Sequence, residues 1–340
     1  MTVTQPHCPH CGAPIARQES GLVYCPYCAT PLVWSRDGFQ TSASYVDDNL
    51  IDPERPRFWL EGHRYRLLGR LAQGESSDVF LALRDHRLTE RVVVKCLRAH
   101  EDRDLWEQEW ETLRTLQQSS ARGSEHFTRL LPQPVASGEG RLGVRGREGR
   151  RLFTICGFAS GFVHSFLDIA DHYKDGVPPA AGVWLWKRIL ELTSFIHSSG
   201  FVHGAITPRH LLVHARDHGV RLCGFSSAVK IGEKLRAFPN DDFDFCSEGA
   251  KGGGAVGPAH DICASARSVL SVMGGSPKKA PGSAPDALAK LLERAAGPEA
   301  GGYQDAWAVR DELDSVAASV FGDAKFIPFP MPGWAFAGAK

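Results

Sequence analysis

The sequence predicts an α+β protein whose larger part has two lobes. Apolar residues alternate, or gather in β-branched runs, from Tyr65 to about residue 158, which is typical of strands. From about residue 181 the apolar residues recur at helical spacing. Strands first and helices second favour a β-rich lobe followed by a helical lobe. The length of 340 residues fits one large domain plus a small additional module.

The apolar pattern divides each lobe into elements. Strands are predicted over residues 65–74, 78–84, 91–98 and 152–158. A helix is predicted over residues 102–118, with apolar positions at Leu105, Trp106, Trp110, Leu113 and Leu116. Further helices are predicted over residues 181–199, 261–273, 284–296 and 304–321.

Composition excludes several classes of protein. The formal net charge is zero, so no strongly basic or acidic balance points to nucleic acid. No apolar run approaches the roughly 18 residues that a membrane helix needs. The N-terminal residues contain no apolar stretch of the signal-peptide type. We therefore expect a cytoplasmic protein that does not enter a membrane.

Four of the nine cysteines form two C-x-x-C pairs, separated by residues 12–24. The pairs are Cys8 with Cys11 and Cys25 with Cys28. Two such pairs supply four thiolates for tetrahedral Zn²⁺. His7 or His10 could replace one cysteine as a ligand. We predict a zinc ribbon over residues 1–34, in which structural Zn²⁺ provides most of the folding energy because so short a segment has little core.

The other cysteines stand singly, as expected of buried thiols in a reducing compartment. They are Cys96, Cys156, Cys223, Cys246 and Cys263. Between the ribbon and the first long strand, residues 35–61 are polar and contain prolines, so they are predicted to form an irregular linker.

Residues 201–213, FVHGAITPRHLLV, carry the clearest motif. They resemble the catalytic loop of the protein kinase superfamily, in which His-Arg-Asp-Leu-Lys-Pro-x-Asn follows apolar residues. The resemblance implies a bilobal protein-kinase-like domain over residues 62–322, with a β-rich N-lobe to about residue 161 and a helical C-lobe. It leaves residues 323–340 as an apolar, proline-rich tail.

The same resemblance implies that the catalytic residues are missing. Ala205 stands where kinases have the aspartate that accepts a proton from the substrate hydroxyl, and His210 where they have a magnesium-binding asparagine. Gly224 stands where they have the magnesium-binding aspartate. His203 and Phe225 match residues that kinases retain. Mg²⁺ is therefore not expected to bind, and the resemblance implies a pseudokinase rather than an enzyme.

Parts of a nucleotide site remain by resemblance. Gly74 matches the central glycine of the phosphate-binding loop, while its flanking glycines are replaced. Lys95 matches the lysine that contacts the ATP phosphates. Cys156 would lie beside the adenine ring, or serve only as a core thiol. Because some nucleotide-site residues match and others are replaced, residual ATP binding stays open, and weak or no binding is favoured.

Other matches concern the fold and the activation segment. Glu109 matches the glutamate that pairs with the phosphate-binding lysine, with Glu107 and Glu111 as rivals. Asp261 resembles the aspartate that opens a central helix and accepts hydrogen bonds from the catalytic-loop backbone. Gly302 and Tyr303 stand where kinases carry an arginine that ties down the activation segment, so that tether is expected to be absent. The carboxylates that could instead rebuild a metal site, or form an exposed acidic loop, are Asp241, Asp242 and Asp244.

Two further segments have no kinase counterpart. A predicted hairpin carries a cluster of arginines, either a solvated turn or a surface for an acidic partner or RNA. The arginines are Arg141, Arg145, Arg147, Arg150 and Arg151. The tail from Phe326 to Phe336 is expected to pack on the larger lobe or to bind a partner in extended form.

Three functions fit these features. The favoured one is a regulatory or scaffolding pseudokinase that binds a protein partner, without nucleic acid or membrane. The second is a protein kinase or nucleotide-transfer enzyme that uses non-standard residues around Lys95 and Glu109. The third is an RNA-binding adaptor that uses the ribbon and the arginine hairpin.

Overall fold

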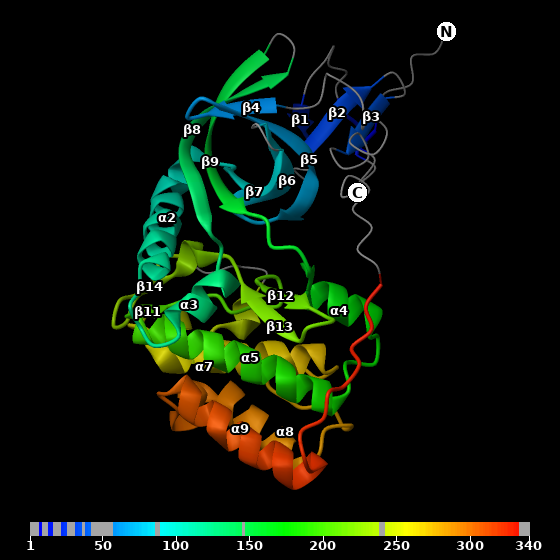
Figure 1. Cartoon of the computed structure of the whole chain (residues 1–340), viewed down its shortest axis with the longest axis vertical. Coiled ribbons are helices and arrows are strands. Elements are labelled where there is room, and N and C mark those ends of the chain that lie inside the picture. Colours follow the sequence, from blue (N-terminus) through cyan, green and yellow to red (C-terminus); the bar gives the residue numbers. More distant parts are fainter. Residues whose placement is uncertain are drawn as a thin grey trace. The chain divides into compact units, whose positions relative to one another are not determined.

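A computed structural model describes residues 7–8, 13–15, 22–25, 31–35, 38–41, 57–85, 89–144, 147–237 and 242–332. The chain divides into two units (Figure 1). The β-rich unit comprises Met1–Trp106, Pro134–Phe158 and Ala335–Lys340, and the helical unit comprises Glu107–Gln133 and Ala159–Trp334.

A small antiparallel sheet lies near the N-terminus. Its strands, in spatial order, are β1 (Leu22–Tyr24), β2 (Pro31–Ser35) and β3 (Gly38–Thr41). Cys8 and Cys25 are buried together with Ile15 and Leu32. The backbone N–H of Cys8 donates to the carbonyl of Ala13 at 2.8 Å. The sequence predicted an irregular linker over residues 35–61. Instead, Gly38–Thr41 pairs with β2 and forms strand β3.

The larger sheet of the β-rich unit is a closed six-stranded barrel. Its strands are β4 (Arg57–Leu60), β5 (His63–Gln73), β6 (Ser77–Asp85), β7 (Glu90–Leu97), β8 (Pro134–Val144) and β9 (Arg147–Gly157). They follow the order β4-β5-β6-β7-β9-β8, and β8 pairs with β4 to close the ring. Closure leaves no free edge among these strands.

Strand β4 corrects the predicted domain boundary. Phe58 and Leu60 are buried in the barrel core, and the Phe58 ring stacks on Tyr65 and Phe153. The larger domain therefore begins by Arg57, not at residue 62, and the linker does not extend to residue 61. Four residues are too few for a period-2 pattern to stand out among polar neighbours.

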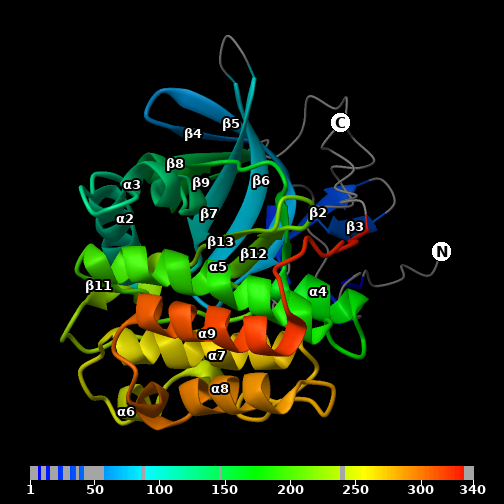
Figure 2. The ribbon, with the colours of Figure 1, turned by 60° about the horizontal axis from the view of Figure 1, so that its bottom comes forward.

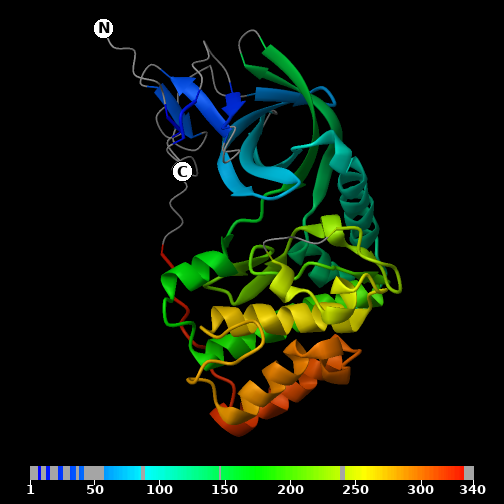
Figure 3. The same ribbon diagram turned by 180° about the vertical axis from the view of Figure 1, so that it is seen from behind.

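The helical unit is built around two long buried helices. Its helices are the C-terminal part of α2 (Arg103–Gln117), then α3 (Ser124–Phe127), α4 (Phe166–His172), α5 (Pro179–Ser198), α6 (Glu248–Lys251), α7 (Pro258–Val272), α8 (Asp286–Ala296) and α9 (Ala306–Phe321). Helix α5 packs against α7 and α9, and α8 packs against α7 (Figures 2 and 3). In the core, the indole N–H of Trp186 donates to Ser265 Oγ at 3.0 Å. Both α5 and α7 begin at a proline, which suits the first helical turn because that position has no intrahelical use for an N–H.

Short strands in the helical unit flank the segments that carry the candidate site. One sheet has the order β10 (Phe162–Ser165), β12 (Leu211–His214) and β13 (Gly219–Leu222). A second pairs β11 (Phe201–Val202) with β14 (Val229–Lys230). Single 3₁₀ turns occur at His100–Asp102, Thr128–Leu130, Phe225–Ser227, Phe243–Phe245 and Pro298–Gly302. The segment between β11 and β12 and the segment after β13 carry the predicted catalytic positions.

The tail, as far as Pro332, packs on the helical unit in extended form. The Phe329 ring stacks on Tyr173 and meets Trp184 edge-on, and the Tyr173 hydroxyl donates to the carbonyl of Pro330. His218 lies between the rings of Trp184 and Phe326. Packing on the larger lobe was one of the two roles expected of this segment. No helix in the described part of the chain is both long and apolar enough to cross a membrane.

Candidate functional site

A buried carboxylate fixes the segment after β11. Asp261, in the first turn of α7, accepts hydrogen bonds from the backbone N–H groups of His203 at 2.7 Å and Gly204 at 2.9 Å. The His197 ring nitrogen Nε2 lies 3.0 Å from the same carboxylate. Burial alone would raise the pKa of Asp261, but the hydrogen bond from His197 and the neighbouring histidines hold that pKa below its usual value.

His203 is fully buried beneath this segment. Its Nδ1 accepts a hydrogen bond from the backbone N–H of Ala205, so Nε2 carries the proton and donates to the carbonyl of Cys223 at 3.1 Å. Its ring meets Phe225 edge-on, with centroids 4.4 Å apart. Burial lowers the pKa of His203 to about 3, which makes the ring neutral at physiological pH. His203 and Phe225 therefore pack together and hold the segment after β11 against the segment after β13.

Gly204 occupies a position where a residue with a side chain would fit poorly. Its φ is +79°, and a Cβ there would lie 2.6 Å from the carbonyl oxygen of Ser227. The carbonyl of Gly204 accepts from His260 Nε2 at 3.1 Å, and burial lowers the pKa of His260. The arginine expected from kinases at position 204 is thus replaced by a residue that lets the chain pass close to Ser227.

His210 and Gly224 fit one another. Gly224 has a φ of +80°, and a Cβ at this position would lie only 2.4 to 2.7 Å from three atoms of the His210 ring. The imidazole is held by Nδ1, which donates to the carbonyl of Ala205 at 2.8 Å, and by a backbone bond from Cys223 N–H to the His210 carbonyl. The ring of His210 therefore fills the space that a side chain at position 224 would need.

Glu109 contacts the same region. This residue of α2 is buried, and its Oε1 accepts a hydrogen bond from the backbone N–H of Phe225 at 3.1 Å. Among the three glutamates considered for the lysine pair, Glu109 is the buried one. The pairing of Lys95 with Glu109 remains a prediction.

The acidic segment lies mostly in the described residues, except for Asp241. Asp242 is buried, and one of its oxygens lies 3.5 Å from Arg209 Nε, whereas the Asp244 side chain is exposed. No group of three or more His, Cys, Asp or Glu side chains gathers as a metal site in the part of the chain that the structure describes. The carboxylates of Asp242 and Asp244 are therefore not assembled with other described ligands.

Arg267 of α7 is a residue that the sequence analysis missed. It is fully buried, and its guanidinium donates to the carbonyls of Asp244, Cys246 and Ala296. Its Nη2 lies 3.6 Å from Glu248, which also pairs with Lys278 at 2.9 Å. Lys278 is the main reason that the pKa of Glu248 is lowered. The segment before α6 is thus tied to α7 by an arginine, although the expected position, at Gly302 and Tyr303, carries none. The helix predicted over residues 261–273 includes position 267, but the sequence contains no sign of its carbonyl partners.

The predicted nucleotide residues of the β-rich unit lie on strands or at a turn. The Gly74 N–H donates to the Ser77 carbonyl across the turn between β5 and β6, and Arg98 donates to the Gly74 carbonyl. Lys95 lies on β7 and Cys156 on β9. Because the N–H of Gly74 already has a partner in the turn, it is not directed at a ligand in this conformation.

The cysteine pairs are partly described. Cys8 and Cys25, one from each pair, are buried in the same cluster, while Cys11 and Cys28 lie outside the described residues. The burial of both thiols in one small cluster fits a shared metal ion.

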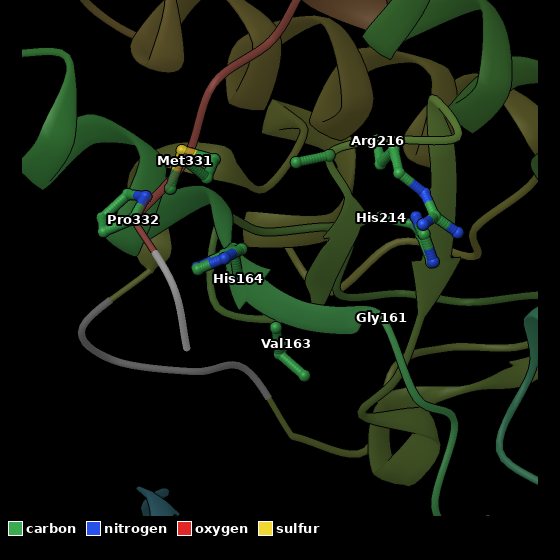
Figure 4. A pocket seen from close by; sticks show the side chains of 8 residues that line it. Gly161, Val163, His164, His214, Arg216, Met331 and Pro332 are labelled. Atoms are coloured by element: carbon green, nitrogen blue, oxygen red, sulfur yellow. The ribbon is translucent and has the colours of Figure 1, made fainter. Parts of the chain in front are cut away.

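An open pocket of about 390 Å³ lies in the helical unit (Figure 4). His164 comes from β10, His214 and Arg216 from the end of β12 and the turn beyond it, and Met331 from the tail. Burial lowers the pKa of His164. None of the residues predicted from the sequence as site residues lines this pocket.

Comparison with solved structures identifies the architecture. The crystal structure of the PknI kinase domain of Mycobacterium tuberculosis matches with a TM-score of 0.54, at 15% sequence identity, over 74% of this chain and 95% of that one. The fold is kinase-like. No protein-family model matches the sequence, and no curated protein matches it. At this identity the likeness concerns the fold alone, so the kinase-like residues must be judged by their own geometry.

Proposed function

We propose that this chain is a pseudokinase, a kinase-like protein impaired in phosphoryl transfer that acts as a regulatory or scaffolding module for a protein partner. The contact between His210 and Gly224 carries the proposal. An imidazole fills the place where a kinase-like metal site needs a carboxylate, and Gly224 has no side chain to bind an ion.

The chemistry of these positions supports impaired transfer. Mg²⁺ prefers oxygen ligands in octahedral geometry, and imidazole is a poor substitute. The Nδ1 of His210 is directed at the carbonyl of Ala205, not at an incoming phosphate. Ala205 has no group to accept a proton, and loss of a general base alone costs roughly 10²–10⁴-fold in rate. Phosphoryl transfer depends on both the metal and the positioned base.

The contacts that maintain the fold are intact by contrast. Asp261 still accepts the backbone N–H groups of His203 and Gly204, and Glu109 still accepts that of Phe225. Arg267 orders the segment that leads to α6. A rigid surface without a working metal site suits binding better than turnover.

The N-terminal segment adds a second module to the proposal. We assign structural Zn²⁺ to Cys8, Cys11, Cys25 and Cys28, because Cys8 and Cys25 are already buried together. Zinc would supply tetrahedral cross-linking of a segment with a four-residue core. Metal analysis of the purified protein should find a single zinc ion per chain, and Cys25→Ser should lower that content, whereas Cys156→Ser should not.

Thermal unfolding with ATP tests the pseudokinase assignment. The titration is run with Mg²⁺, with Mn²⁺ and with metal removed from the nucleotide only, after checking that zinc is retained. A ligand at 100 times its Kd raises the unfolding free energy by about 2.7 kcal/mol, so binding would be visible. We expect no shift that requires Mg²⁺.

A repaired variant provides the matched control. Ala205→Asp combined with His210→Asn and Gly224→Asp restores the kinase-like residues, and we expect it to gain a Mg²⁺-dependent shift. The opposite result would be a Mg²⁺-dependent shift in the natural chain, with phosphate or nucleotide transfer that Lys95→Ala abolishes. That result would replace the pseudokinase by an enzyme of unusual chemistry.

A further inference from the structure

A basic row crosses the outside of the barrel, away from its core. In the strand register, Trp59 of β4 pairs with Arg64 of β5 on one side and with Arg141 of β8 on the other. Arg141 in turn pairs with Arg150 of β9. Directly paired residues on adjacent strands point to the same face, so Arg64, Trp59, Arg141 and Arg150 form one continuous row over four strands. We call this the arginine–tryptophan row.

The alternation along β4 fixes which face carries the row. Phe58 and Leu60 are 0% and 2% exposed and belong to the barrel core, so Trp59 between them points outward. Trp59 is 44% exposed, although tryptophan usually buries most of its surface. The barrel core is complete without this indole, which leaves it available to a ligand.

Exposed guanidinium groups, two of them in ion pairs, dominate the described side chains of the row. Asp85 pairs with Arg64 at 2.6 Å and with Arg66 at 3.1 Å, and Glu139 pairs with Arg150 at 3.2 Å. Arg64 and Arg150 are 49% and 74% exposed at the side chain, and Arg141 is also exposed. The row thus presents three exposed arginines around Trp59, with the carboxylates of Asp85 and Glu139, themselves at least partly exposed, beside Arg64 and Arg150.

We propose that the arginine–tryptophan row binds single-stranded nucleic acid, with a base stacked on Trp59 and the neighbouring phosphates on the arginines. Adjacent strands lie about 4.8 Å apart, so Arg64 and Arg141 flank the indole at a distance their long side chains can span. An exposed aromatic face in a basic surface is the arrangement that binds single strands without sequence preference. An acidic protein segment would use the arginines but has no need of the indole between them. This activity goes beyond the pseudokinase assignment and does not depend on it.

Fluorescence anisotropy with a labelled 15-nucleotide oligouridylate tests the proposal on the full-length protein. We expect binding at 50 mM salt that weakens steeply at 200 mM, since each phosphate contact contributes about 0.7 to the slope of log K against log salt for single strands. Trp59→Ala should weaken binding about tenfold, as expected for the loss of one stacked base. Arg141→Ala should weaken it and also lower the salt slope by about 0.7.

Two matched variants separate the row from general effects. Trp307→Ala removes a tryptophan of α9 with nearly the same exposure, 42%, and should leave binding unchanged. Arg122→Ala removes an exposed arginine of the helical unit and should also have no effect. Circular dichroism confirms that each variant is folded.

Two outcomes would overturn the proposal. One is the absence of binding at 50 mM salt. The other is binding that Trp59→Ala leaves intact and that polyglutamate matches at equal charge, which would make the row a surface for an acidic protein. A Trp59→Phe variant that restores binding, where Trp59→Ala does not, would support stacking.

Discussion

Two sets of residues in the helical unit lie around the same two loops and have opposite properties. The anchoring set, Asp261, His203 and Glu109, is buried and hydrogen-bonded to the backbone of the candidate site. The chemical set, Ala205, His210 and Gly224, offers no carboxylate, and His210 fills the space beside Gly224. The loop conformation of a kinase-like fold is therefore maintained by groups that differ from those needed for phosphoryl transfer. One set can be lost while the other is kept.

The largest expected effect is in the anchoring set. Asp261→Ala leaves two buried backbone N–H groups and His197 without their acceptor, so the unfolding free energy should fall by about 3–5 kcal/mol. Urea denaturation measures this change. Asp305→Ala is the control, because it removes an exposed carboxylate that caps α9 and should cost only about 1 kcal/mol. Equal losses in both variants would mean that Asp261 does not anchor the site.

In the chemical set, Gly224→Asp alone should destabilise the protein by about 2–4 kcal/mol. The left-handed backbone and the His210 ring both oppose a side chain there. Gly232→Asp isolates the backbone contribution, since Gly232 has a φ of +91° with open space around it. His210→Asn should recover about 1 kcal/mol or more in the Gly224→Asp background. Strict additivity in this double-mutant cycle would remove the evidence that the two residues fit one another.

Arg267→Met tests whether the tether of α7 belongs to the anchoring set. Three carbonyls would lose their donor, and we expect a loss of about 2–3 kcal/mol. Hydrogen exchange should rise mainly in residues 242–251. Arg310→Met, at a partly exposed ion-paired site, should cost about 1 kcal/mol or less. If residues 242–251 stay protected from hydrogen exchange in Arg267→Met, other contacts must order this segment.

The smallest expected effect is the response of the anchoring set to pH. The folded pKa of His203 is about 3, below the 6.5 of an unperturbed histidine, so below pH 6.5 the unfolded chain binds a proton that the folded chain does not. The stabilisation from this group is fully present above pH 6.5, is lost as the pH falls toward the folded pKa, and should have decreased by about 1.4 kcal/mol at pH 5.5. Urea denaturation at pH 7.0 and 5.5, compared with His203→Gln, measures the difference. If the unfolding free energy of His203→Gln depends on pH as steeply as that of the natural chain, the His203 ring is not buried in its neutral form.

Long elements were predictable because their pattern is local. The predicted helices over residues 181–199 and 304–321 correspond to α5 and α9, and the strand over residues 91–98 to β7. Strand β4 was not predictable, since its pairing partners β5 and β8 are what make Arg57–Leu60 a strand. Likewise, the arginine hairpin was visible in the sequence, but not the placement of Trp59 in the same row.

The sequence by itself determined the order of strands and helices, since this depends on local patterns, and its resemblance to kinases implied the candidate catalytic positions and the residues that stand there. Tertiary structure decided how the residues at these positions pack. The approach of the His210 ring to Gly224, the three carbonyls around Arg267 and the closure of the barrel by β4 all join residues distant in the chain. Such contacts depend on how packed segments meet, and no local pattern encodes that geometry.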